Sequence, residues 1–155
     1  MARRGGSIAA VDALSAPALI ARHLDEIGVP ADRRGEREWS VSVPCTKRGS
    51  VGVLLLVRER SLGMRAFVMR APDRDRLGVW ERLLGKNLTT RDWRFAIDHD
   101  ADVYALADAP LAGLDAGTLD GLLGSLSTLI DETYESLVRT GFDVPEGTEF
   151  RPPPG

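Results

Sequence analysis

The spacing of apolar residues predicts a helix followed by three strands in the first half of the chain. Apolar side chains recur at helical spacing over residues 16–27, and Gly28 ends this run. Residues 39–43 alternate between apolar and serine side chains, as in a strand with one buried face. Residues 51–58 form a nearly continuous run of β-branched residues and leucine, typical of a central strand packed on both faces. A short connection leads to a third strand over residues 63–70, which favours an antiparallel hairpin.

The second half of the chain predicts a helix, a hairpin and a long final helix. Pro72 and Asp73 are expected to open a helix that ends near residues 85–87. Its apolar stripe consists of Leu77, Trp80, Leu84 and Leu88. Residues 93–97 and 103–106 are predicted to pair across an acidic turn. An amphipathic helix follows over residues 115–141 and is closed by Gly141.

The order α-β-β-β-α-β-β-α predicts an α+β fold with one antiparallel sheet. A chain of 155 residues with 43% apolar residues has room for one domain with one core. We expect this domain over residues 16–142, between a flexible N-terminal tail (1–15) and a flexible, proline-rich C-terminal tail (143–155).

Several short signatures are similar to those of the YbjN domain family. In the second half of the chain they are Arg94-Phe95-Ala96-Ile97-Asp98, residues 109–114, residues 119–124, Asp131-Glu132 and Gly141-Phe142, and residues 67–72 and 83–88 resemble the middle of the family's domain. The resemblance covers roughly residues 16–142. It implies a fold like the type III secretion chaperones, a role as a bacterial sensory-transduction regulator, and frequent occurrence in actinobacteria. The family supplies no agreed catalytic residues, so none is carried over. Ala101 stands where the family's turn is expected to carry Gly, which puts the tightness of this hairpin in question.

Composition and charge narrow the location and the partners. The net charge of −3 and a pI near 5.4 give no general attraction to nucleic acid. Cys45 is the single cysteine, which fits a reducing cytoplasm. The apolar run behind the basic N-terminus is short and is broken by Asp12, so we do not expect a signal peptide. The most apolar stretch, Val51–Val57, is far shorter than the roughly 20 residues of a membrane-spanning helix. We therefore expect a cytoplasmic protein with no nucleic-acid or membrane partner.

The candidate metal motifs are weak. Asp98, Asp100 and Asp102 imitate the first ligands of a calcium loop, but Val103 and Ala109 stand where that loop needs glycine and glutamate. We interpret this segment as an acidic hairpin turn. The soft and imidazole ligands His23, Cys45 and His99 lie far apart in sequence without the spacing of a zinc site. We predict no metal and no cofactor.

No catalytic motif is recognised either. Residues 78–87 lack the spacing and the hydroxyl residue of a phosphate loop, and neither 49–52 nor 123–125 has the pattern around a nucleophilic serine. We therefore predict no catalytic residues. The remaining route to an enzyme or a small-ligand site is a pocket assembled from distant residues. Conceivable contributors are Arg65, Arg94, Asp98 and Tyr104.

The sequence favours a non-enzymatic protein-binding or regulatory module, with the alternatives being the assembled pocket and a purely structural homodimer subunit. The binding surface could be a sheet face or a helix groove, and self-association is expected. Small residues line part of the final helix, namely Gly117, Gly121, Gly124, Ser125 and Thr128. They could allow close approach of another backbone or could simply weaken an exposed helix face. The sequence does not separate these two interpretations.

Overall fold

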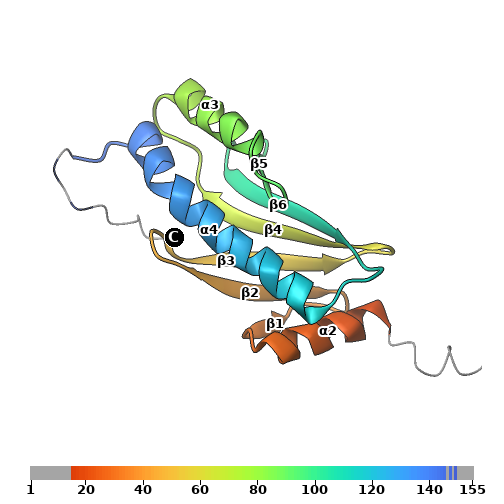
Figure 1. Cartoon of the computed structure of the whole chain (residues 1–155). Coiled ribbons are helices and arrows are strands. Elements are labelled where there is room, and N and C mark those ends of the chain that lie inside the picture. The colour runs from red at the N-terminus through yellow and green to blue at the C-terminus, as the bar shows by residue number, and fades with distance from the viewer. Residues whose placement is uncertain (1–14, 146, 148, 150–155) are drawn as a thin grey trace, which may run out of the picture.

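The computed structural model describes residues 15–145, 147 and 149, and six strands form one antiparallel sheet in it (Figure 1). The helices are α2 (Ala16–Ile27), α3 (Arg76–Asn87) and α4 (Ala116–Gly141). The strands are β1 (Ala31–Arg33), β2 (Glu38–Cys45), β3 (Gly49–Val57), β4 (Ser61–Met69), β5 (Arg94–Ile97) and β6 (Val103–Pro110). Their spatial order is β1-β2-β3-β4-β6-β5. The predicted α+β class and element order are confirmed, and the short strand β1 is an addition that the sequence pattern did not reveal.

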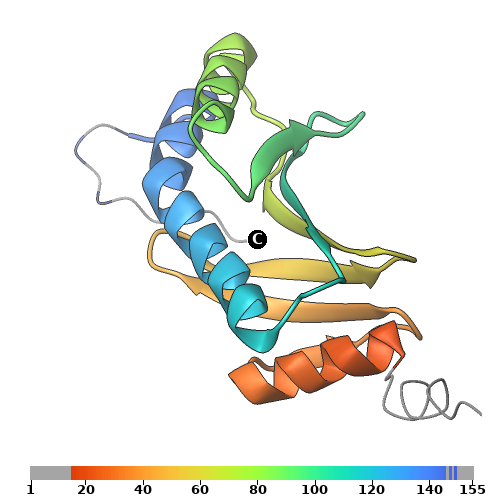
Figure 2. The same ribbon diagram turned by 45° about the vertical axis from the view of Figure 1, so that its right-hand side comes forward.

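Helix α4 lies across one face of the sheet, with α2 beside the β1–β2 end and α3 beside the β5 end (Figures 1 and 2). The strands turn alternate side chains toward these helices and bury them. In β3 the buried residues are Val51, Val53, Leu55 and Val57. No described helix covers the other face of the sheet, which we call the open face (Figure 2).

The prediction that residues 51–58 are packed on both faces is wrong. Ser50 and Gly52 are exposed on the open face, and Leu54 retains 38% of its accessible surface. The apolar run hid the alternation of buried and exposed positions, because leucines, Leu54 and Leu56, also occupy open-face positions of this strand. An antiparallel sheet with one solvated face does not require polar residues at every outward position.

Helix α3 begins later than predicted. Asp75 is its N-cap and its carboxylate accepts a hydrogen bond from the Gly78 backbone N–H at 3.1 Å, so the helix starts at Arg76. Asp73 has another use, since its backbone N–H donates to the Gly141 carbonyl at 2.8 Å. This bond and the close approach of Gly141 to Pro72 tie the end of α4 to the entrance of α3.

The first fourteen residues of the predicted N-terminal tail and most of the C-terminal one lie outside the described residues. Among the described residues, no helix is both long and apolar enough to cross a membrane.

Candidate functional site

The acidic turn between β5 and β6 uses its carboxylates to hold the backbone. The Asp98 carboxylate accepts hydrogen bonds from the N–H groups of Asp100 (2.9 Å) and Asp102 (3.0 Å). The Asp102 carboxylate accepts from the Ala71 N–H at 2.8 Å and so links the turn to the end of β4. Ala101 sits at φ 65°, in the left-handed region that favours glycine. The hairpin thus forms without the family's expected glycine, at some conformational cost.

Possible ligand atoms gather at this turn in a different set from the one considered in the sequence. One ligand atom each from Asp98, His99 and Asp100 lie within 4.8 Å of one another, and Asp102 is not part of this group. His99 and Asp100 are exposed side chains 3.3 Å apart. Exposed acidic groups of this kind are common without an ion, and the hydrogen bonds above already explain the turn.

The remaining soft and imidazole ligands lie on separate elements. His23, on α2, is buried, and its Nε2 lies 3.0 Å from the Leu114 carbonyl, which can only accept a hydrogen bond. Nε2 is therefore the protonated nitrogen, and Nδ1 has no partner among the described residues. Cys45, at the end of β2, is also buried, and burial raises the pKa of its thiol. A protonated, buried thiol is a poor nucleophile.

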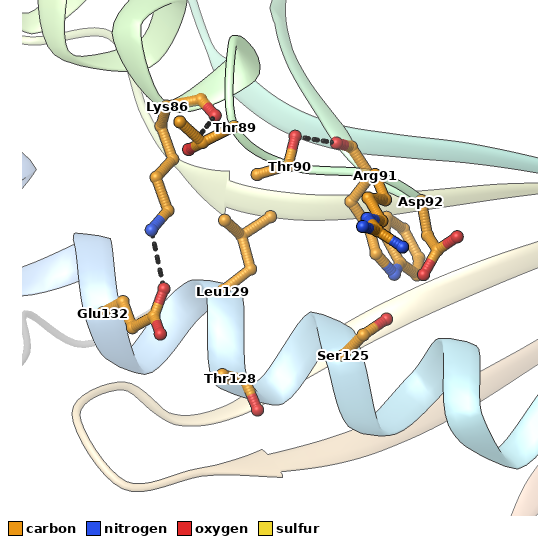
Figure 3. Close-up of a pocket in the computed structure, with 10 residues that line it drawn as sticks. Lys86, Thr89, Thr90, Arg91, Asp92, Ser125, Thr128, Leu129 and Glu132 are labelled. Carbon is orange, nitrogen blue, oxygen red and sulfur yellow. Dashed lines mark hydrogen bonds and ion pairs between the residues drawn. The ribbon is translucent and has the colours of Figure 1, made fainter.

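A hollow of about 320 Å³ lies between the α3–β5 connection and α4 (Figure 3). Several of its polar groups already have partners: Lys86 Nζ is 2.6 Å from a Glu132 carboxylate oxygen, and the Thr89 and Thr90 hydroxyls donate to backbone carbonyls. Arg91 and Asp92 also line it and are exposed. Trp93 is buried beside it and donates from Nε1 to the Leu122 carbonyl at 2.9 Å. The hollow therefore contains stabilising contacts between α3 and α4, and no polar group in it stands out as a catalytic one.

Three leucines of α3 and its C-cap are exposed among charged residues, contrary to the predicted stripe facing the core. Leu77 and Leu84 each expose 69% of their surface and Leu88 exposes 87%. We call these three residues the α3 stripe. The residues that α3 buries are Val79 and Leu83. The prediction that this side of the helix faces the core is wrong because α3 packs at one end of the sheet, against β5 and α4 (Figure 1). At this position two buried side chains are enough to pack the helix. Trp80, predicted at the centre of the buried side, is only partly buried.

The open face brings together three of the four conceivable pocket residues. Arg65 on β4 and Arg94 on β5 both pair with Leu106 of β6, so they lie in one row across the sheet. The Arg65 guanidinium carbon lies 3.9 Å from the centre of the Tyr104 ring. Arg94 is paired with Asp108 at 3.3 Å, and Asp98 belongs to the turn described above.

A shallow hollow of about 370 Å³ lies on this open face. Six of the residues that line it are Arg34, Ser40, Leu54, Arg65, Phe67 and Tyr104. The Phe67 and Tyr104 rings meet edge to face with their centres 5.6 Å apart. Sequence reasoning missed Arg34 and Phe67 as site residues, although strand alternation already places Phe67 on the same face as Arg65.

The model of the YbjN family, described as "Putative bacterial sensory transduction regulator", matches residues 16–139. The chain belongs to the YbjN family. Curated relatives of this YbjN chain include an uncharacterised protein of Mycobacterium tuberculosis, 29% identical over 102 residues, and one of Mycobacterium leprae, 30% identical over 102 residues. Both alignments cover 66% of this chain, which spans only about 56% and 55% of the two relatives.

Solved structures show the same fold at low sequence identity. Escherichia coli YbjN has a TM-score of 0.61 and 13% identity, over 80% of this chain and 96% of that one. The Yersinia pestis type III secretion chaperone SycH, crystallised with a stable fragment of YscM2, has a TM-score of 0.51 and 19% identity, over 75% and 97%. The ExoU–SpcU complex of Pseudomonas aeruginosa gives 0.54 and 17%, over 78% and 96%. The predicted chaperone-like fold and family membership are therefore both confirmed.

Proposed function

We propose that this YbjN domain is a non-enzymatic protein-binding module that acts through the α3 stripe. The observation that carries the proposal is the exposure of Leu77, Leu84 and Leu88 on one helix. Apolar side chains grouped on a surface mark interaction sites more often than chance, because leaving them in water costs free energy. Similar chaperone folds have been crystallised together with protein partners, which supports a protein as the ligand.

The competing interpretation is an enzyme or a small-ligand protein, for which a deep polar pocket would be the natural evidence. In the hollow of Figure 3, Lys86 is paired with Glu132 and the Thr89 and Thr90 hydroxyls donate to backbone carbonyls, while Arg91 and Asp92 are exposed. The hollow on the open face is shallow and contains no acidic, histidine or cysteine side chain. Both observations favour a binding surface over a reaction site.

The first occupant that we propose for the α3 stripe is a second copy of this chain. Two copies of α3 packed antiparallel about a two-fold axis would place Leu77 of one copy near Leu88 of the other, with Leu84 and the exposed Glu81 both close to the axis. A two-fold interface requires such self-complementary pairs. The acidic turn at residues 98–102 is excluded from this interface, because like charges would meet across the axis.

Sedimentation equilibrium tests the homodimer. The dimer predicts a mass that rises above 16.8 kDa with concentration and returns to the monomer value in Leu84→Glu. Arg60→Ala, on the exposed β3–β4 turn, is the matched control and should behave like the wild type. A constant mass near 16.8 kDa up to about 100 μM would refute the homodimer and leave a different protein as the occupant.

An affinity pull-down from the native organism tests the wider proposal. Wild-type protein and the Leu84→Glu variant are compared by mass spectrometry. A binding module predicts at least one protein, or the chain itself, that is retained by the wild type and lost by the variant. Identical sets of retained proteins would contradict a function at the α3 stripe.

A further inference from the structure

The open face of the sheet carries a second site. We propose that the hollow lined by Arg34, Leu54, Arg65 and Tyr104 binds an extended peptide segment with an apolar side chain between two acidic ones. The inference rests on the proposed function in taking a protein as the ligand, but it concerns a surface away from the α3 stripe.

The strand register builds the apolar centre of this site. Ser40, Leu54, Arg65 and Leu106 are successive partners across β2, β3, β4 and β6. Neighbouring strands lie about 4.8 Å apart, so Leu54 is flanked on one side by Arg65 at close range. On its other side Leu54 is flanked by Ser40, whose partner in β1 is Asp32. The hollow therefore has an apolar residue, Leu54, in its lining together with the two guanidinium groups of Arg65 and Arg34.

These two guanidiniums are available, unlike the others on the open face. Arg58 and Arg94 both bind the carboxylate of Asp108, at 3.1 and 3.3 Å. Neither Arg34 nor Arg65 forms an ion pair with any described carboxylate, and no acidic residue lines the hollow. The acidic side chains on this face, apart from Asp108, are Asp32 and Glu38 at the β1–β2 edge, outside the lining. The local charge thus favours carboxylates as ligands, in spite of the net charge of the chain.

The stacking of Arg65 on Tyr104 decides between kinds of anion. The Arg65 guanidinium carbon lies 3.9 Å from the centre of the Tyr104 ring, over its face. A guanidinium that stacks on an aromatic face is held in place while the N–H donors at its edge stay available. A nucleotide base that stacked on Tyr104 would have to displace Arg65. A carboxylate can instead accept two hydrogen bonds from the edge of the guanidinium without moving it. An extended peptide turns every second side chain to the same surface, so an acidic residue two positions from an apolar one fits Arg65 beside Leu54.

Fluorescence anisotropy with a labelled peptide tests this site. The probe is a short peptide that contains the sequence Glu-Ser-Leu-Ser-Glu, so that in an extended conformation the Glu, Leu and Glu side chains face one way. We expect saturable binding to the full chain and a loss of about tenfold or more in affinity for Arg65→Ala and for Arg34→Ala, as is usual when a charged hydrogen bond is removed. Arg65→Lys should lose most of this affinity as well, since lysine keeps the charge but not the bidentate edge. Arg60→Ala removes the same charge away from the hollow and should bind like the wild type.

Specific results would overturn the inference. They are no saturable binding of the peptide, equal weakening by Arg60→Ala, or equal binding of a peptide with lysine in place of glutamate. Tighter binding of a thymidine oligonucleotide, lost in Arg65→Ala, would replace the peptide by single-stranded nucleic acid and also refute it. Thermal unfolding confirms that each variant is folded, and Arg34 and Arg65 serve as independent tests because both are exposed. Leu84→Glu separates the two proposals: it should abolish self-association and leave peptide binding intact, so either proposal can fail alone.

Discussion

Alanine substitution at three glycines of α4 should change stability in opposite directions. Gly121 and Gly124 are exposed, and a methyl group built at either position would meet no heavy atom within 4 Å. Glycine in a helix interior costs about 0.5–1 kcal/mol relative to alanine, because its backbone loses more freedom on folding. The double variant Gly121→Ala/Gly124→Ala should therefore gain about 1–2 kcal/mol of unfolding free energy.

Gly141, in the last turn of the same helix, supplies the matched contrast. A methyl group there would lie 2.9 Å from Pro72 Cβ, closer than real carbon contacts allow, and 3.1 Å from Val79 Cγ2, which is a tight contact. Overpacking of this kind costs about 1–3 kcal/mol. The clash should exceed the gain in helix propensity, so Gly141→Ala should lower stability although the chemical change is the same.

Urea unfolding followed by circular dichroism measures both effects, with an unchanged m-value as the sign that the two-state comparison holds. A loss of stability in the Gly121→Ala/Gly124→Ala variant would refute the reasoning, since it would mean that these glycines contact something. A fall in molecular mass for that variant would identify the contact as a second copy of the chain. Urea unfolding together with the molecular mass thus distinguishes an exposed face from a packing surface on the glycine-lined side of α4.

Three further predictions follow from packing, charge and ligand chemistry. Trp93→Ala should cost about 3–5 kcal/mol because the indole is buried and hydrogen-bonded, whereas partly buried Trp80 should cost only about 1–2 kcal/mol; urea unfolding that ranks them the other way would contradict the structure. The backbone N–H of Lys47 donates to the Asp131 carboxylate at 2.9 Å, and this hydrogen bond is the main cause that lowers the pKa of Asp131. The ionised Asp131 carboxylate therefore contributes stability above the unfolded-state pKa, and this contribution is lost as pH falls through the folded-state pKa. Asp131→Asn should therefore be less stable than the wild type at pH 7, and a gap that does not narrow below about pH 4 would count against this linkage. Calcium, zinc and magnesium should leave the melting temperature unchanged, and a saturable rise of several degrees at micromolar metal would establish a site, for which the turn at residues 98–100 is the first candidate.

The order of helices and strands was predictable from the sequence because the spacing of apolar residues and the glycines and prolines that end each element are local features. The pattern over residues 16–27 and the closing Gly141 both correspond to observed helix limits. Which face an element buries depends on its neighbours, and there the pattern over residues 51–58 and the stripe of α3 both misled. Leucine at positions 54 and 84 looks the same in the sequence as leucine at a core position, and only the placement of the helices on one face and at one end distinguishes them.

The candidate surfaces were predictable only in part for the same reason. Arg65 and Tyr104 could be named as conceivable partners from the sequence. Their contact depends on the pairing of β4 with β6, and α3 and β5 separate these two strands in the sequence. Arg34 could not be named at all, because the three-residue strand that brings it to the open face has too little pattern to be recognised.

The two edges of the sheet limit the pairing of a further strand from another chain. Strand β1 covers only residues 39–41 of β2, and β5 covers only residues 103–106 of β6. Each uncovered half carries a proline, Pro44 in β2 and Pro110 in β6, which cannot donate a backbone hydrogen bond to an incoming strand. The edge strands β1 and β5 are thus short, and the uncovered parts of β2 and β6 are each interrupted by a proline. Proteins that resist polymerisation through their sheets have edges of this kind. The exposed leucines of the α3 stripe thus belong to a domain whose sheet edges offer little to an incoming strand.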